Sequence, residues 1–188
     1  KKKVTVVLTG EGGDELFAGY PRYRLPRVLA LTRSAGVWPV RVLSVITALA
    51  DGRKGRIIRS CLGKPDDFVI ASNARYVLAE EVGRLCEGDT LEARLGLVPQ
   101  GGNLLTRTLE FDQLTYLHNV LERMDKMTMA AGLEARVPFL DHRIVEFAAK
   151  LAASTKMPRL QTKAVLKRAA KGLVPPELIG RRKSGFGV

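Results

Sequence analysis

The segment from residue 4 to residue 20 constrains the fold more than any other, because it combines a strand, a tight turn and a helix start. Residues 4–9 are apolar and mostly β-branched, which predicts a strand buried on both faces of a parallel sheet. Residues 10–13 predict a tight turn, and Asp14 stands where a helix N-cap is expected. One strand cannot form a sheet. Either its partners lie outside these residues, or the chain folds differently from a longer parent.

The remainder of the chain predicts helices and loops. Residues 37–50 are apolar on nearly every face and predict a buried helix, and residues 104–133 show sustained helical periodicity. Asp141 and Thr162 each precede a helical pattern as expected N-caps, and Gly172 is expected to close the second of these helices. We therefore expect a mostly α-helical chain with one strand, residues 4–8, near its N-terminus.

Composition restricts the class of protein. Hydrophobic residues make up 46% of the chain, which favours a packed core over disorder. Cys61 and Cys86 form no C-x-x-C pair, so neither a disulfide framework nor a structural zinc site is indicated, and we expect reduced thiols in a cytoplasmic protein. Pro39 and Arg41 interrupt the longest apolar stretch, so no membrane span is expected.

The net charge of +12 favours contact with polyanions such as nucleic acid, membrane surfaces or nucleotide phosphates. An equally good explanation is that this basic piece normally contacts an acidic partner domain. Aromatic residues make up only 6% of the chain, and they are not interleaved with basic residues as a base-stacking surface requires. Nucleic-acid binding is therefore the weaker of these interpretations.

The turn after the strand is the first candidate site. Its glycines allow close approach of a ligand to the backbone, and the following helix start attracts anions. Three nearby carboxylates would repel a bare phosphate, whereas Mg²⁺ could bridge a carboxylate to phosphate oxygens. The alternative is an ordinary strand-to-helix turn whose acids complement the helix dipole. The residues concerned are Gly10, Glu11, Gly12, Gly13, Asp14 and Glu15.

Two further segments are candidates. In residues 134–141, Glu134 and Arg136 are interpreted as a local ion pair, followed by Asp141 as a helix cap. Lys163 opens a helix, where a cation opposes the dipole, so it could instead stabilise negative charge at an acyl-phosphate centre. We expect its ammonium group to point across the site toward the Glu11–Asp14 turn. The basic tail around Lys183 is either an anion-binding lid or a frayed end.

Three blocks of the sequence resemble successive parts of the C-terminal domain of asparagine synthetases: LTGEGGDELFAGYPRY, ERMDKMTMAAGLEARVPFLDHRIVEFAAKL and TKAVLKRAAKGLVPPELIGRRKSGFGV. The resemblance implies an α/β fold with a parallel sheet of the ATP-pyrophosphatase, or adenine-nucleotide alpha-hydrolase, type. It also implies an ATP- and Mg²⁺-dependent ligase of asparagine biosynthesis. In that family MgATP adenylates aspartate, and ammonia released from glutamine attacks the β-aspartyl adenylate.

The resemblance also implies roles for single residues. Glu11 matches a carboxylate that orients or deprotonates ammonia, Asp14 an acid associated with Mg²⁺, and Lys163 a lysine that stabilises the transition states. Other matching positions are implied to bind substrate or ATP: Gly10, Gly12, Gly13, Arg136 and Lys183.

Two family features are absent from residues 1–188: the S-G-G-x-D-S pyrophosphate loop, and the N-terminal glutaminase domain with its cysteine nucleophile. We therefore expect the chain to be part of a synthetase domain that is inactive alone. The activity is expected in the full-length protein, which could also form a homodimer. Another amide-forming synthetase of this fold is an alternative, although Glu11 favours ammonia because β-lactam relatives carry tyrosine in this turn. A non-catalytic basic module that binds nucleic acid is the alternative from another class.

Overall fold

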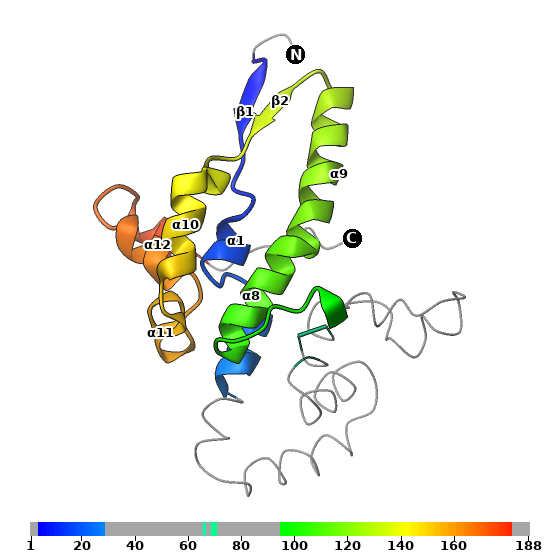
Figure 1. Cartoon of the computed structure of the whole chain (residues 1–188). Coiled ribbons are helices and arrows are strands. Elements are labelled where there is room, and N and C mark those ends of the chain that lie inside the picture. Colours follow the sequence, from blue (N-terminus) through cyan, green and yellow to red (C-terminus); the bar gives the residue numbers. More distant parts are fainter. Residues whose placement is uncertain (1–3, 29–65, 67–68, 71–94, 182–188) are drawn as a thin grey trace, which may run out of the picture.

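The computed structural model describes residues 4–28, 66, 69–70 and 95–181, and these residues are mostly helical, as expected (Figure 1). The predicted buried helix over residues 37–50 lies outside the described residues, as does Lys183, so both remain predictions. No helix of the described part is long and apolar enough to cross a membrane.

Strand β1 (Val6–Leu8) pairs in parallel with strand β2 (Glu134–Arg136). The expectation that the strand lacks a partner within the chain is therefore wrong. The second strand was missed because it is three residues long and lies in a segment interpreted as an ion pair before a helix cap. The ion pair itself is confirmed, with 2.5 Å between Arg136 Nη2 and Glu134 Oε1.

Burial of β1 also differs from the expectation. Val6 is 46% exposed and Leu8 is 76% exposed, although a strand inside a parallel sheet is covered on both faces. Val6 and Leu8 lie on the same face of the strand, and the described residues leave that face open, whereas Val7 on the other face is partly buried. The two strands lie side by side, with Val6 opposite Glu134 and Leu8 opposite Arg136, and the Thr9 N–H donates to the Arg136 carbonyl oxygen at 2.8 Å.

The turn after β1 leads into the short helix α1 (Gly13–Leu16). Its N-cap is Gly12, at φ 84°, and not Asp14 as predicted; Asp14 lies within the first turn. Glycine is required at the cap because a Cβ on Gly12 would lie 2.3 Å from Leu140 Cδ2. The helix therefore starts two residues earlier in the chain than predicted, where Leu140 packs closely against the turn, a contact that sequence pattern cannot show.

Helices α8 (Leu104–Leu114) and α9 (Tyr116–Ala130) confirm the helical pattern of residues 104–133, with a break at Thr115. Asn103 caps α8 by accepting a hydrogen bond from the Thr106 N–H. One face of α8 joins a core cluster under α1, formed by Ala18, Tyr23, Leu105, Leu109, Ala153 and Met157.

The chain after β2 forms a series of short helices: η2 (Pro138–Leu140), α10 (His142–Lys150), α11 (Ala153–Lys156), η3 (Pro158–Leu160), α12 (Ala164–Ala169) and α13 (Pro176–Ile179). Asp141 caps α10, as predicted, by accepting from the Arg143 N–H at 3.0 Å. Thr162 was expected to cap α12, but the N-cap is Lys163, in a left-handed conformation. Gly172 has a positive φ just beyond this helix, whose C-cap is Ala170.

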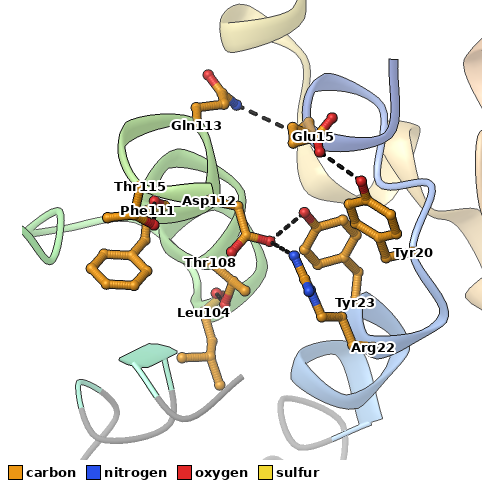
Figure 2. A network of polar contacts seen from close by, with 10 residues as sticks. All are labelled: Glu15, Tyr20, Arg22, Tyr23, Leu104, Thr108, Phe111, Asp112, Gln113 and Thr115. Carbon is orange, nitrogen blue, oxygen red and sulfur yellow. Dashed lines mark hydrogen bonds and ion pairs between the residues drawn. The ribbon is translucent and has the colours of Figure 1, made fainter. Parts of the chain in front are cut away.

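These elements enclose α1, which contacts α8 on one side and α10 on the other (Figure 1). A polar network fixes the side toward α8 (Figure 2). The buried carboxylate of Asp112 accepts hydrogen bonds from Arg22 and from Tyr23, both at 2.5 Å. The Arg22 guanidinium also lies over three aromatic rings, those of Tyr20, Tyr23 and Tyr116.

Glu15 belongs to the same network and is 1% exposed. Its carboxylate accepts a hydrogen bond from the Tyr20 hydroxyl at 2.7 Å, and its carbonyl oxygen accepts one from Gln113 of α8 (Figure 2). Burial raises the pKa of Glu15, and the hydrogen bond from Tyr20 opposes that rise only in part. The first turn of α1 is thus anchored by a carboxyl group that binds its proton more tightly than an exposed glutamate.

The position of Gly12 yields a first prediction. Gly12→Ala should destabilise the full-length protein by about 1–3 kcal/mol, because alanine is strained at positive φ and its methyl group would overlap Leu140. Urea unfolding measures the loss. Gly96→Ala is the matched control, since no atom lies within 4 Å of the added methyl there. Equal stability of the two variants would contradict the packing described.

The buried Glu15 yields a second prediction. Folding raises the pKa of Glu15 above its ordinary value of 4.5, so the folded state binds the proton more tightly than the unfolded state. The free energy of unfolding should therefore decline as the pH rises from 4.5 to the raised pKa. Glu15→Gln keeps a hydrogen-bonding partner for Tyr20 but removes this titration, so the decline should flatten. Thermal unfolding across pH 4 to 8 measures it, with exposed Glu146→Gln as the control. An unchanged pH profile in Glu15→Gln would rule out this carboxyl as the source.

Candidate functional site

The site centres on a pair of opposite charges from distant parts of the chain. Asp14 lies in the first turn of α1, and Lys163 is the N-cap of α12. Lys163 Nζ lies 2.8 Å from Asp14 Oδ1. The Asp14 side chain is 15% exposed and that of Lys163 is 34% exposed, so the pair is shielded but still reachable from solvent.

The backbone is strained on both sides of this ion pair. Lys163 has φ 54°, and Ala18, just after α1, also has φ 54°, a region that non-glycine residues seldom adopt. Such conformations cost about 1–3 kcal/mol each and persist where the surrounding structure fixes them, often at functional sites. Here α1 and α12 are fixed by a shared apolar cluster that includes Leu16, Phe17, Val165 and Leu166.

The ion pair with Asp14 explains how a lysine is tolerated at the start of α12. A cation beside a helix N-terminus is disfavoured by about 0.3–1 kcal/mol. Asp14 offsets that cost by holding an opposite charge at hydrogen-bonding distance from the ammonium group. The arrangement leaves a lysine at the edge of a glycine-rich turn, where it can stabilise negative charge on a bound group.

The predicted turn residues lie between β1 and α1. Glu11 is half-buried, Gly10 is exposed, and Gly12 and Gly13 are buried. The two buried glycines lie under η2, since a Cβ on Gly13 would lie 3.3 Å from Phe139 and one on Gly12 would overlap Leu140. The turn therefore has an open side at Gly10 and a closed side against η2.

Arg136 and Asp141 belong to the scaffold around this turn. The Arg136 side chain is 64% exposed and pairs with Glu134, while its carbonyl oxygen holds Thr9 at the start of the turn. Hydrogen bonds from Arg143 lower the pKa of Asp141 to about 2, so this cap stays ionised over the physiological range.

A magnesium ion held by protein ligands alone finds no support in the described residues, where no three His, Cys, Asp or Glu side chains gather as a metal site. A nucleotide-bound Mg²⁺ needs less, because it takes one or two carboxylates and fills its other positions with phosphate oxygens and water. Asp14 fits that smaller requirement as a single carboxylate ligand beside a glycine-rich turn.

Sequence reasoning did not identify every residue that shapes the site. Gly19 lies against Asp14 and Lys163. Tyr20 donates a hydrogen bond to Glu15, the residue that follows Asp14. The only signal for Gly19 was its presence in the motif LFAGYPRY. The expectation that Lys163 points toward the Glu11–Asp14 turn is confirmed, since Lys163 Nζ lies 2.8 Å from Asp14 Oδ1, a contact that depends on packing of α12 against α1.

Comparisons with known proteins identify the family to which the chain is similar. The asparagine synthase family profile matches residues 1–188. The chain is 34% identical to a putative glutamine-hydrolyzing asparagine synthetase of Mycobacterium tuberculosis H37Rv and 32% identical to asparagine synthetase 1 of Bacillus subtilis 168, in each case over 100% of the chain. A chicken (Gallus gallus) asparagine synthetase is 40% identical over 38% of the chain.

The chain spans only about 30% of the length of the mycobacterial relative and 31% of the Bacillus one. No solved structure matches the chain. The family match over the whole chain and the bacterial relatives nevertheless lead to one conclusion: this chain belongs to the asparagine synthase family.

Proposed function

We propose that this chain forms part of the synthetase site of a glutamine-hydrolysing asparagine synthetase. The observation that carries the proposal is the Asp14–Lys163 ion pair, which joins two family motifs at the edge of the turn after β1. The relatives are named as asparagine synthetases that hydrolyse glutamine, and they are about three times as long as this chain. The rest of the protein would supply the remaining strands, of an ATP-pyrophosphatase type fold, and a glutaminase domain.

The proposed reaction has two steps. In the first, a carboxylate oxygen of aspartate attacks the α-phosphorus of ATP, and the bond to pyrophosphate breaks. In the second, ammonia from glutamine attacks the acyl carbon, and AMP leaves with the electron pair of the acyl–oxygen bond. Bound Mg²⁺ would neutralise phosphate charge. Homodimer formation and a cytoplasmic location belong to the same proposal.

The residues of this chain would divide the work. Lys163 would stabilise negative charge on the α-phosphate and then on the acyl oxygen, because preorganised charge is effective in a shielded site. Asp14 would bind the magnesium of MgATP and, before substrate arrives, would hold Lys163 in position. Glu11, at the half-buried part of the turn, would orient ammonia or accept its proton.

Binding of the nucleotide would use the backbone more than side chains. No described residue beyond its chain neighbours packs against Gly10, so a phosphate oxygen could approach the backbone N–H there, while the Gly10 carbonyl oxygen accepts from the Gly13 N–H. Gly12 and Gly13, closed against η2, would keep the turn rigid. Arg136 would support the turn through its carbonyl bond to Thr9, and Lys183, if its segment folds over the site, would contact the phosphates.

Lys163→Ala in the full-length protein should lower aspartate- and ATP-dependent turnover by about 10²–10³-fold, because one preorganised electrostatic contact is lost. The fold should stay intact, and glutamine hydrolysis should continue at its normal rate, since its chemistry belongs to another domain. Coupled assays of pyrophosphate and glutamate release measure the two activities. Lys171→Ala, an exposed lysine after the same helix, is the control. Normal synthetase turnover in Lys163→Ala would contradict the proposed role.

Asp14→Asn should reduce pyrophosphate release and raise the Mg²⁺ concentration needed for half-maximal rate, because a charged ligand is lost. Titration of Mg²⁺ at saturating aspartate and ATP measures both quantities, with exposed Asp125→Asn as the control. A lower maximal rate at an unchanged Mg²⁺ requirement would assign Asp14 to positioning Lys163 alone. Unchanged pyrophosphate release would exclude both roles.

A further inference from the structure

Gly19 occupies an unusual position beside the ion pair. A Cβ added there would lie 1.7 Å from Asp14 Oδ1, 2.7 Å from Asp14 Cγ and 2.5 Å from Lys163 Cε. Distances below about 3 Å do not occur between a Cβ and such atoms, so the side chains would have to move. The carboxylate and the lysine methylene therefore occupy the volume that any other residue at position 19 would fill.

Backbone conformation does not explain this glycine. The described glycines with positive φ are Gly12, Gly101, Gly102, Gly132 and Gly172. Gly19 is not among them, although its neighbour Ala18 is left-handed at φ 54°. A glycine whose backbone suits alanine makes the unfolded chain more flexible, and its replacement by alanine normally stabilises by about 0.4–1 kcal/mol. Position 19 thus lacks a side chain for reasons of space.

The space is filled by the ends of two side chains and not by backbone. An added methyl group could be accommodated if Asp14 rotated about its χ1 and χ2 bonds and Lys163 withdrew, which leaves the fold intact but separates the pair. The backbone of Gly19 is itself tied to Asp14, because its N–H donates to the Asp14 carbonyl oxygen at 2.8 Å. The methyl group could not move away without breaking that bond.

We infer that Gly19 is a positioning residue, which keeps open the space where the Asp14 carboxylate meets the Lys163 ammonium group. This inference rests on the proposed role of Lys163 and adds a residue that touches neither substrate nor metal. It acts only through the geometry of the pair. A displacement of about 1 Å in such a group can cost on the order of 100-fold in rate.

Gly19→Ala in the full-length protein tests the inference. Turnover with aspartate and ATP should fall between about 10- and 100-fold, while the unfolding temperature stays within about 2 °C of the parent because flexible side chains absorb the overlap. Gly96→Ala adds the same methyl group where it meets no described residue beyond its chain neighbours, so it should leave turnover unchanged and should not lower the unfolding temperature. Full activity of Gly19→Ala would overturn the inference.

A double-variant comparison separates positioning from general damage. In a background that carries both Asp14→Ala and Lys163→Ala, where neither overlapping side chain remains, adding Gly19→Ala should lower the residual turnover by less than about twofold, because residues acting as a unit are not additive. An equal loss in both backgrounds would overturn the inference. If Gly19→Ala alone lowers the unfolding temperature, Asp14→Ala must restore it by removing the overlapping carboxylate, and failure to restore it would also overturn the inference.

The role of Gly19 and the proposed function of the ion pair can be disproved separately. If Lys163→Ala is inactive in synthesis while Gly19→Ala is fully active, the role of Gly19 is wrong and the proposed function stands. If both variants keep normal turnover, the proposed function of the pair is itself wrong.

Discussion

The parallel pairing of β1 with β2 is the constraint on which the rest of the described structure depends. It joins segments far apart in sequence and holds Thr9 against the Arg136 carbonyl oxygen. The chain leaving β1 must therefore turn directly beneath η2, which follows β2. Leu140 then packs where Gly12 has no side chain, and the short helix α1 starts at the next residue. Without this pairing, the turn would lose its alignment with η2, against which Gly12 and Gly13 pack.

Two kinds of interaction hold α1 on its opposite sides. Toward α8 the contact is polar and buried, because Asp112 accepts from Arg22 and Tyr23 while Glu15 is anchored by Tyr20. A buried charge of this kind is costly unless fully paired, which makes the network sensitive to the loss of any partner. Toward α10 and α12 the contact is largely apolar. Between these supports, the structure tolerates left-handed backbone next to the Asp14–Lys163 pair.

The candidate site is assembled by this scaffold and not by local sequence. An acid from the N-terminal turn and a lysine from the C-terminal region form a shielded pair, and a glycine provides the space between them. The pairing also explains how a cation is tolerated beside the start of α12. The family profile matches residues 1–188, a range that contains both residues of the pair. The assignment of the pair to a synthetase site is our proposal.

The sequence by itself determined the strand–turn–helix unit, the long helical region of residues 104–133, the cap at Asp141 and the family, because each depends on local periodicity or on a motif. The sequence also predicted that Lys163 points toward the Glu11–Asp14 turn, and the structure confirms this contact at 2.8 Å. Tertiary structure alone decided that residues 134–136 form a strand and that Gly12 and Lys163 are caps. Short strands and left-handed caps carry little local signal. They form because distant segments pack against them and exclude every other conformation, and that information lies in contacts between residues far apart in the chain.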